Sequence, residues 1–108
     1  MNEHETYVSL EVAKLLKEAG FYWECPDKYE RSIMACRYED YEKPTLAVAQ
    51  RWLREVMCEY VVVHPIVNKW FYSIHRPNFG HYYRDKKFST YEEAQEAGIK
   101  KALELILK

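Results

Sequence analysis

The sequence contains little of what breaks up regular structure, with three Gly and four Pro among 108 residues. This scarcity excludes a low-complexity or collagen-like chain. Long apolar runs are also missing, since Val61–Val63 and Leu105–Leu107 fall far short of the roughly 20 residues that cross a bilayer. Neither sign of charge predominates, because the chain has 16 Lys and Arg and 17 Asp and Glu. The net charge of −1 therefore gives no global attraction to nucleic acid or membrane.

The N-terminus lacks the basic start and apolar core of a secretory signal, which predicts a cytoplasmic protein. Cysteines are few, and Cys25, Cys36 and Cys58 form no C-x-x-C pair. Their odd number and irregular spacing argue against a disulfide framework and against a zinc ribbon. We expect three reduced, partly buried thiols, because free cysteine packs like a small hydrophobic side chain.

Helical periodicity predicts three helices. Ser9 can cap a helix over about residues 10–19, and Gly20 can end it in the left-handed conformation. Thr45 can cap a second helix that runs to about Met57.

The last helix has the strongest local signal in the chain. Thr90 and Glu93 form a capping box, followed by an apolar stripe that includes Gly98. A glycine in such a stripe costs about 1 kcal/mol relative to alanine, so it predicts close approach of this helix to a sheet.

Alternating β-branched and aromatic residues predict strands over Tyr60–Val67, Trp70–Arg76 and His81–Phe88. Asn68-Lys69 and residues 77–80 supply the two turns. Pro65 lacks an N–H group, so its strand should lie at an edge or bulge there. Residues 21–43 are less regular, with two possible short strands at Phe21–Trp23 and Ser32–Cys36.

These elements predict an α+β fold in a single domain over residues 1–108. Residues 1–43 would form an N-terminal helix and an irregular segment anchored by aromatic rings. Residues 44–108 would form an α-β-β-β-α unit, whose three-stranded antiparallel meander packs on the second and last helices.

The predicted turns assign a face to each strand residue. Pairing Val67 with Trp70 and Arg76 with His81 gives an inner, core-facing set: Val61, Val63, Val67, Trp70, Tyr72, Ile74 and Tyr83. The opposite, outer set mixes aromatic and basic residues: His64, Phe71, Ser73, His75, Tyr82, Arg84 and Lys86. Residues 60–89 hold five basic residues and one acidic residue, so this segment is the basic part of the chain.

Motifs for catalysis and for metal binding are missing. The sequence has no G-x-S-x-G, no glycine-rich phosphate loop and no H-E-x-x-H, so we expect no enzyme and no cofactor. His64 and His75 would be diagonal neighbours on one face and His81 would lie on the other. Two histidines without a third ligand are a weak zinc site, so we also expect no metal.

Three blocks resemble a family of small uncharacterised bacterial proteins encoded in prophages and conjugative elements: Ser9–Leu16, Pro44–Glu55 and Thr90–Gly98. The resemblance spans most of the chain and implies a mobile-element setting without a known activity.

The element order over residues 45–107 is similar to that of double-stranded-RNA-binding domains. Phe88–Ala94 after three strands also resembles the arm-type DNA-binding domains of phage integrases. Glu92 and Glu93, however, stand where duplex-RNA binders place lysines. This departure favours the integrase likeness, in which the sheet itself enters the groove.

Two functions remain. Surplus aromatic residues favour a non-enzymatic accessory or interaction protein, which binds an unknown protein partner or associates with itself. The alternative is DNA or RNA binding by the outer face of the sheet, where stacking rings would lie among cations. That site would consist of His64, Phe71, His75, Tyr82, Arg84 and Lys86.

Overall fold

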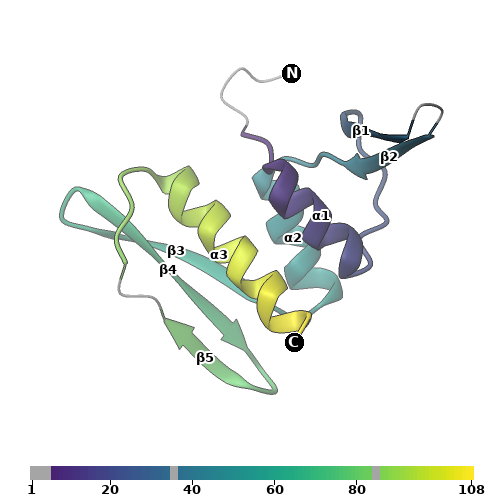
Figure 1. Ribbon diagram of the computed structural model, residues 1–108. Coiled ribbons are helices and arrows are strands. Elements are labelled where there is room, and N and C mark those ends of the chain that lie inside the picture. The colour runs from purple at the N-terminus through teal and green to yellow at the C-terminus, as the bar shows by residue number, and fades with distance from the viewer. Residues whose placement is uncertain (1–5, 35–36, 84–85) are drawn as a thin grey trace.

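A computed structural model describes residues 6–34, 37–83 and 86–108. This part of the chain is α+β, as the sequence predicts, and it has three helices and two antiparallel sheets, of which only the three-stranded one was predicted (Figure 1). The elements in chain order are α1 (Leu10–Glu18), β1 (Lys28–Met34), β2 (Arg37–Glu42), α2 (Leu46–Val56), β3 (Tyr60–Ile66), β4 (Lys69–Arg76), β5 (Gly80–Tyr83) and α3 (Tyr91–Ile106). None of the helices in the described residues has the length and hydropathy to cross a bilayer.

All three helices begin at their predicted caps. The side-chain oxygens of Ser9, Thr45 and Thr90 each accept a backbone N–H from three residues further on, at 3.3, 3.2 and 3.1 Å. Gly20 has a φ of +96° just beyond α1, the left-handed conformation that glycine adopts without strain. The helix boundaries were therefore predictable from local hydrogen bonding.

Helix α3 lies at the centre of the molecule, between the three-stranded sheet and the other two helices (Figure 1). A Cβ on Gly98 would lie 2.6 Å from Val61 Cγ1 and 3.1 Å from Tyr72 Cγ. This distance confirms the predicted close approach of the last helix to the sheet. Helix α2 also contacts β3, so the meander packs on the second and last helices as expected.

The irregular segment predicted over residues 21–43 is instead largely a β-hairpin. β1 and β2 pair antiparallel with Tyr29 opposite Tyr41, and Phe21–Trp23 is not a strand. Phe21 is buried because its ring packs edge-on against Trp52, with centroids 5.4 Å apart. Tertiary packing thus overrides the strand propensity of these aromatic residues.

The first turn of the meander lies one residue earlier than predicted. Val67 and Asn68 take φ values of 26° and 63°, and Pro65 rather than Val67 lies opposite Trp70. The pairing of β3 with β4 therefore moves by two positions, which leaves the residues of these two strands on their predicted faces. Val67 itself, predicted in the core, is 89% exposed in the turn.

Pro65 lies in an edge strand, one of the two predicted outcomes, and the pairing runs through it without a bulge. The N–H and C=O of Trp70 bond to Phe88 on the other side of β4. The Pro65–Trp70 pair therefore needs no hydrogen bond from proline, which explains why the strand tolerates it.

The second turn corrects the predicted faces. Gly80, with a φ of +88°, pairs with Arg76, so His81 lies opposite His75 instead of Arg76. This is a shift of one position, and a one-position shift turns every β5 side chain to the other face. Tyr82 therefore lies on the inner face opposite Ile74, and the backbone of Tyr83 pairs with that of Ser73.

Candidate functional site

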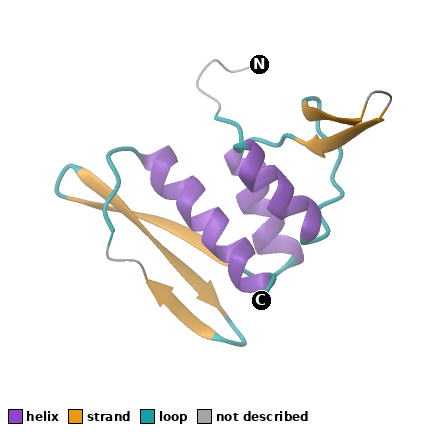
Figure 2. Ribbon diagram, in the orientation of Figure 1, coloured by secondary structure: helices purple, strands orange, loops and turns teal. Residues whose placement is uncertain are grey.

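The outer face of the three-stranded sheet, opposite α3, is covered by no other element of the described residues. All three helices lie on the inner side of this sheet (Figure 2). Register places eight residues of β3 and β4 on the outer face: Tyr60, Val62, His64, Ile66, Lys69, Phe71, Ser73 and His75. β5 adds His81. Tyr60, Val62 and Ile66 remain 37–38% exposed, so apolar surface flanks the half-buried rings of this face.

Imidazole and hydroxyl groups form the middle of the outer face. Ser73 is fully buried beneath neighbouring side chains, and its Oγ lies 2.8 Å from His64 Nε2 and 3.3 Å from His75 Nε2. The His64 ring stacks on Phe71, with centroids 4.7 Å apart, and the His75 ring meets His81 edge-on at 4.5 Å. These contacts fix the rings in place, so this part of the surface is organised before anything binds.

The structure keeps only part of the predicted nucleic-acid site together. His64, Phe71 and His75 share the outer face as predicted. Tyr82 does not, because its ring packs against Tyr72 on the inner side at 6.4 Å. Lys86 lies beside α3, and Arg84 lies outside the described residues. The predicted mixture of rings and cations is therefore not one surface.

Sequence reasoning placed His81 on the wrong face. With the observed register it joins His64 and His75, so three histidines share the outer face. A signal was present in Gly80, because a glycine at positive φ commonly closes a three-residue hairpin loop, here residues 77–79. Even so, no group of three or more His, Cys, Asp or Glu among the described residues is arranged to hold a metal ion.

Lys86, the one cation of the predicted site within the described residues, lines a pocket elsewhere. A pocket of about 210 Å³ between α3 and the segment that follows β5 is lined by Tyr72, Lys86, Phe88, Lys100, Lys101 and Glu104. Lys101 Nζ lies 5.0 Å from the centroid of the Tyr82 ring, which also accounts for that ring's half-buried state. This pocket and the outer face are thus on opposite sides of the sheet.

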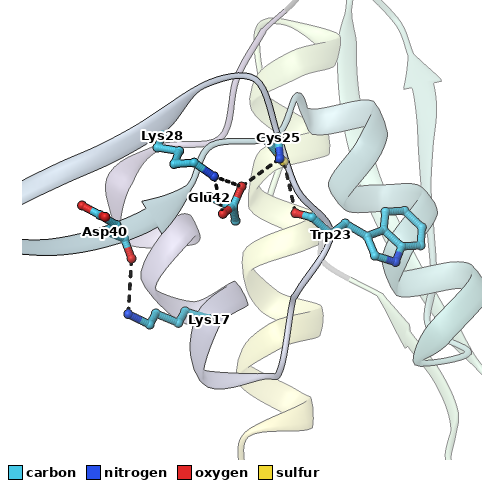
Figure 3. Close-up of polar contacts among 6 residues, drawn as sticks. All are labelled: Lys17, Trp23, Cys25, Lys28, Asp40 and Glu42. Carbon is cyan, nitrogen blue, oxygen red and sulfur yellow. Dashed lines mark hydrogen bonds and ion pairs between the residues drawn. The ribbon is translucent and has the colours of Figure 1, made fainter.

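A polar cluster joins the β1–β2 hairpin to the segment before it (Figure 3). The Glu42 carboxylate accepts the backbone N–H of Cys25 at 2.8 Å and pairs with Lys28 Nζ at 2.7 Å. The hydrogen bond from Lys28 lowers the pKa of Glu42, and the same bond raises the pKa of Lys28. This is the arrangement of a structural clamp on the hairpin.

The described cysteines are only partly as predicted. Cys25 is half-buried, and burial followed by the charge of Glu42 raises the pKa of its thiol. A raised pKa leaves little thiolate at neutral pH, so this sulfur is a poor nucleophile. Cys58 is exposed rather than partly buried, because its φ of 55° belongs to the turn that ends α2. Cys36 lies outside the described residues.

A pocket of about 400 Å³ lies near Cys25, lined mainly by apolar atoms of Tyr7, Pro26, Pro44 and Val48. Glu24, Asp27 and Lys43 add charges of both signs. Lys43 Nζ is held 5.1 Å from the Tyr7 ring and 4.9 Å from the Tyr29 ring. Opposed charges around one apolar space indicate no single class of ligand.

Comparison with known proteins adds no relative to this description. No protein-family model matches the chain, and neither the curated proteins nor the solved structures contain a match to it.

Proposed function

We propose that this chain is a non-enzymatic interaction protein that associates with a second copy of itself through the outer face of β3–β4–β5. The observation that supports this most directly is the open face itself. Tyr60, Val62 and Ile66 remain exposed beside rings that neighbouring contacts hold in place. Apolar and aromatic side chains of this kind anchor protein interfaces.

Charge favours a second copy over a charged partner. Among the described side chains on the outer face, Lys69 alone carries a fixed charge, and it is the first residue of β4. Two such faces can pack together without bringing like charges into opposition, and two sheets stack naturally about 10 Å apart. A twofold arrangement would place the same residues on both sides of the interface.

Nucleic-acid binding by this face has less support. Of the two cations in the predicted nucleic-acid site, Lys86 lies on the inner side of the sheet and Arg84 lies outside the described residues. Binding of DNA or RNA depends on cations that meet phosphates, and among the described residues of the outer face only Lys69 carries a fixed positive charge. An accessory role in a phage or mobile element rests on the sequence resemblance, and the genes that flank this one would test it.

The first prediction is that the purified chain forms a dimer in a concentration-dependent manner, measured by sedimentation velocity. Val62→Glu should weaken this association at least tenfold, because it would place two carboxylates against each other across the interface. Val67→Glu is the matched control, since Val67 is exposed in the turn and outside the face. The control should associate as the wild type does.

Two outcomes would contradict the proposal. One is a wild-type chain that stays monomeric up to about 1 mM, a concentration that would detect an association free energy of about −4 kcal/mol. The other is a dimer that Val62→Glu and Val67→Glu weaken equally. Circular dichroism of both variants would show that each remains folded.

A further inference from the structure

The pocket between α3 and the segment that follows β5 lies on the other side of the sheet from the proposed interface. Its volume is about 210 Å³, and its lining includes three lysines, Lys86, Lys100 and Lys101. Its floor is aromatic, since Tyr72 and Phe88 also line it. Such a concentration of like charge costs energy unless something offsets it.

Contacts with aromatic rings hold two of these ammonium groups near the pocket. Lys86 Nζ lies 5.4 Å from the centroid of the Phe88 ring, and Lys101 Nζ lies 5.0 Å from that of Tyr82. A cation over a ring face is attracted to it but keeps its remaining hydrogens available. Among the described residues, no carboxylate lies within ion-pair distance of Lys86 or Lys101.

The third ammonium group is balanced differently. Lys100 Nζ pairs with Glu11 at 2.6 Å, and the Glu11 carboxylate raises the pKa of Lys100. Glu104 adds one more carboxylate to the pocket lining. Three cations against two carboxylates leave an excess of positive charge, and the two unpaired cations are the ones on the rings.

We propose that this pocket binds a phosphate group, with Lys86 and Lys101 as its main donors and Lys100 as a third. Lysine binds phosphate as a compact point charge with three donors, and such charge-assisted hydrogen bonds are among the stronger ones. The volume is below the roughly 300–1,000 Å³ of sites for drug-sized ligands, which favours one phosphate group over a whole nucleotide. The group can come from free phosphate or from a nucleic-acid backbone.

The test is an NMR titration of the isotopically labelled full chain with sodium phosphate, at an ionic strength kept constant with sodium chloride. The Cε signals of Lys86, Lys100 and Lys101 should shift and saturate together. Lys69, exposed at the start of β4, should not respond. A parallel titration uses a single-stranded oligodeoxynucleotide that has no terminal phosphate.

Matched variants distinguish phosphate binding in the pocket from a general effect of the positive charge of the chain. Lys86→Met with Lys101→Met keeps unbranched side chains over the rings and removes both charges, so phosphate affinity should fall at least tenfold. Lys69→Met removes one charge outside the pocket and should leave the affinity within about twofold.

The two titrations distinguish the source of the phosphate. If the oligonucleotide binds more tightly than inorganic phosphate, and the double variant loses this binding, the natural ligand is a nucleic-acid backbone. Saturation by inorganic phosphate with no added effect of the oligonucleotide identifies the free ion. The proposal is overturned if neither probe gives a saturable shift, or if the double variant binds as the Lys69→Met chain does.

Discussion

The two sheets of this protein are held in place by different forces. The β3–β4–β5 sheet packs its inner face on α3, where Val61, Tyr72 and Ile74 are buried. The β1–β2 hairpin has two strands and extends from the helices near α1 (Figure 1). Its apolar attachment is smaller, with Tyr41 buried in the core and Tyr29 packed against it, and polar and cation–π contacts such as those of Glu42 and Lys43 add to it.

This difference predicts unequal contributions to stability. Burial of apolar area contributes about 25 cal/mol per Å², whereas an exposed ion pair contributes about 0–1 kcal/mol. A two-stranded hairpin is at best marginal by itself and depends on what it packs against. We therefore expect changes in the three-stranded sheet to unfold the whole chain, and changes in the hairpin clamp to act locally.

The largest effect is expected at the buried ion pair beside the three-stranded sheet. Arg76 Nε bonds to both carboxylate oxygens of Glu59 at 2.7 and 3.0 Å, and the Glu59 side chain is 4% exposed. Arg76→Met would leave a buried carboxylate without its partner, at a cost of about 3–5 kcal/mol in unfolding free energy. Urea denaturation measures this loss.

An exposed pair of the same chemistry provides the control. Arg51 pairs with Glu55 on the surface of α2, with side chains 62% and 46% exposed. Arg51→Met should cost no more than about 0.5 kcal/mol. Equal losses for the two arginine variants would remove the distinction between a buried and an exposed attachment.

The second effect tests the contact of α3 with the sheet. Gly98→Ala should destabilise the chain by about 1–3 kcal/mol, although alanine favours a helix by about 1 kcal/mol. The reason is that the new Cβ would lie 2.6 Å from Val61 Cγ1, in a side chain that is stiff at χ1. Urea denaturation of the variant gives the change.

Val61→Ala provides the internal control, because it removes the methyl group that the new Cβ would meet. Alone it should destabilise the chain, but in the Gly98→Ala background its cost should be smaller. If the stability losses of Val61→Ala and Gly98→Ala are additive, or if Gly98→Ala is more stable than the wild type, then α3 does not approach the sheet as closely as the structure indicates.

The smallest effect is expected at the hairpin clamp. The folded-state pKa of Glu42 is below its ordinary value, so its stabilisation is present above that ordinary value, about 4.3. It is lost as pH falls through the lowered pKa and the carboxylate is protonated. Glu42→Gln should therefore lower the melting temperature at pH 7, and the gap to wild type should close at low pH.

Glu11→Gln is the matched control for this pH series, since Glu11 forms an exposed pair with Lys100 away from the hairpin. Amide hydrogen exchange should locate the effect of Glu42→Gln in β1, β2 and the Cys25 amide. Faster exchange throughout α3 instead would mean that the hairpin and the core unfold as one unit.

Local signals in the sequence were sufficient for the helices and for β3 and β4, whereas the third strand, predicted over His81–Phe88, is β5 over Gly80–Tyr83. Ser9, Thr45 and Thr90 cap as their side chains predict, since a cap depends on atoms within three residues. Gly98 also indicated its own close packing. Of the β1–β2 hairpin, only Ser32–Met34 falls within a predicted strand, and the rest was missed because Lys28–Met34 and Arg37–Glu42 are charged and lack a clear alternation.

The candidate site was less predictable, and a single turn is responsible. His64, Phe71 and His75 stayed on their predicted face because a shift of two positions preserves alternation. Tyr82 and His81 exchanged faces because Gly80 entered the ladder. The length of a turn is decided by backbone conformation and by packing against α3, where the Tyr82 ring meets Tyr72 and Lys101.

The sequence by itself therefore determined where each helix begins, about where the first two end, and the order of the elements of the meander. Tertiary structure alone decided which side chains of β5 face outward, where Lys86 lies, and which surface stays uncovered. The physical reason is one of range. Capping and periodicity act within a few residues, whereas strand register is chosen by contacts between residues far apart in the chain.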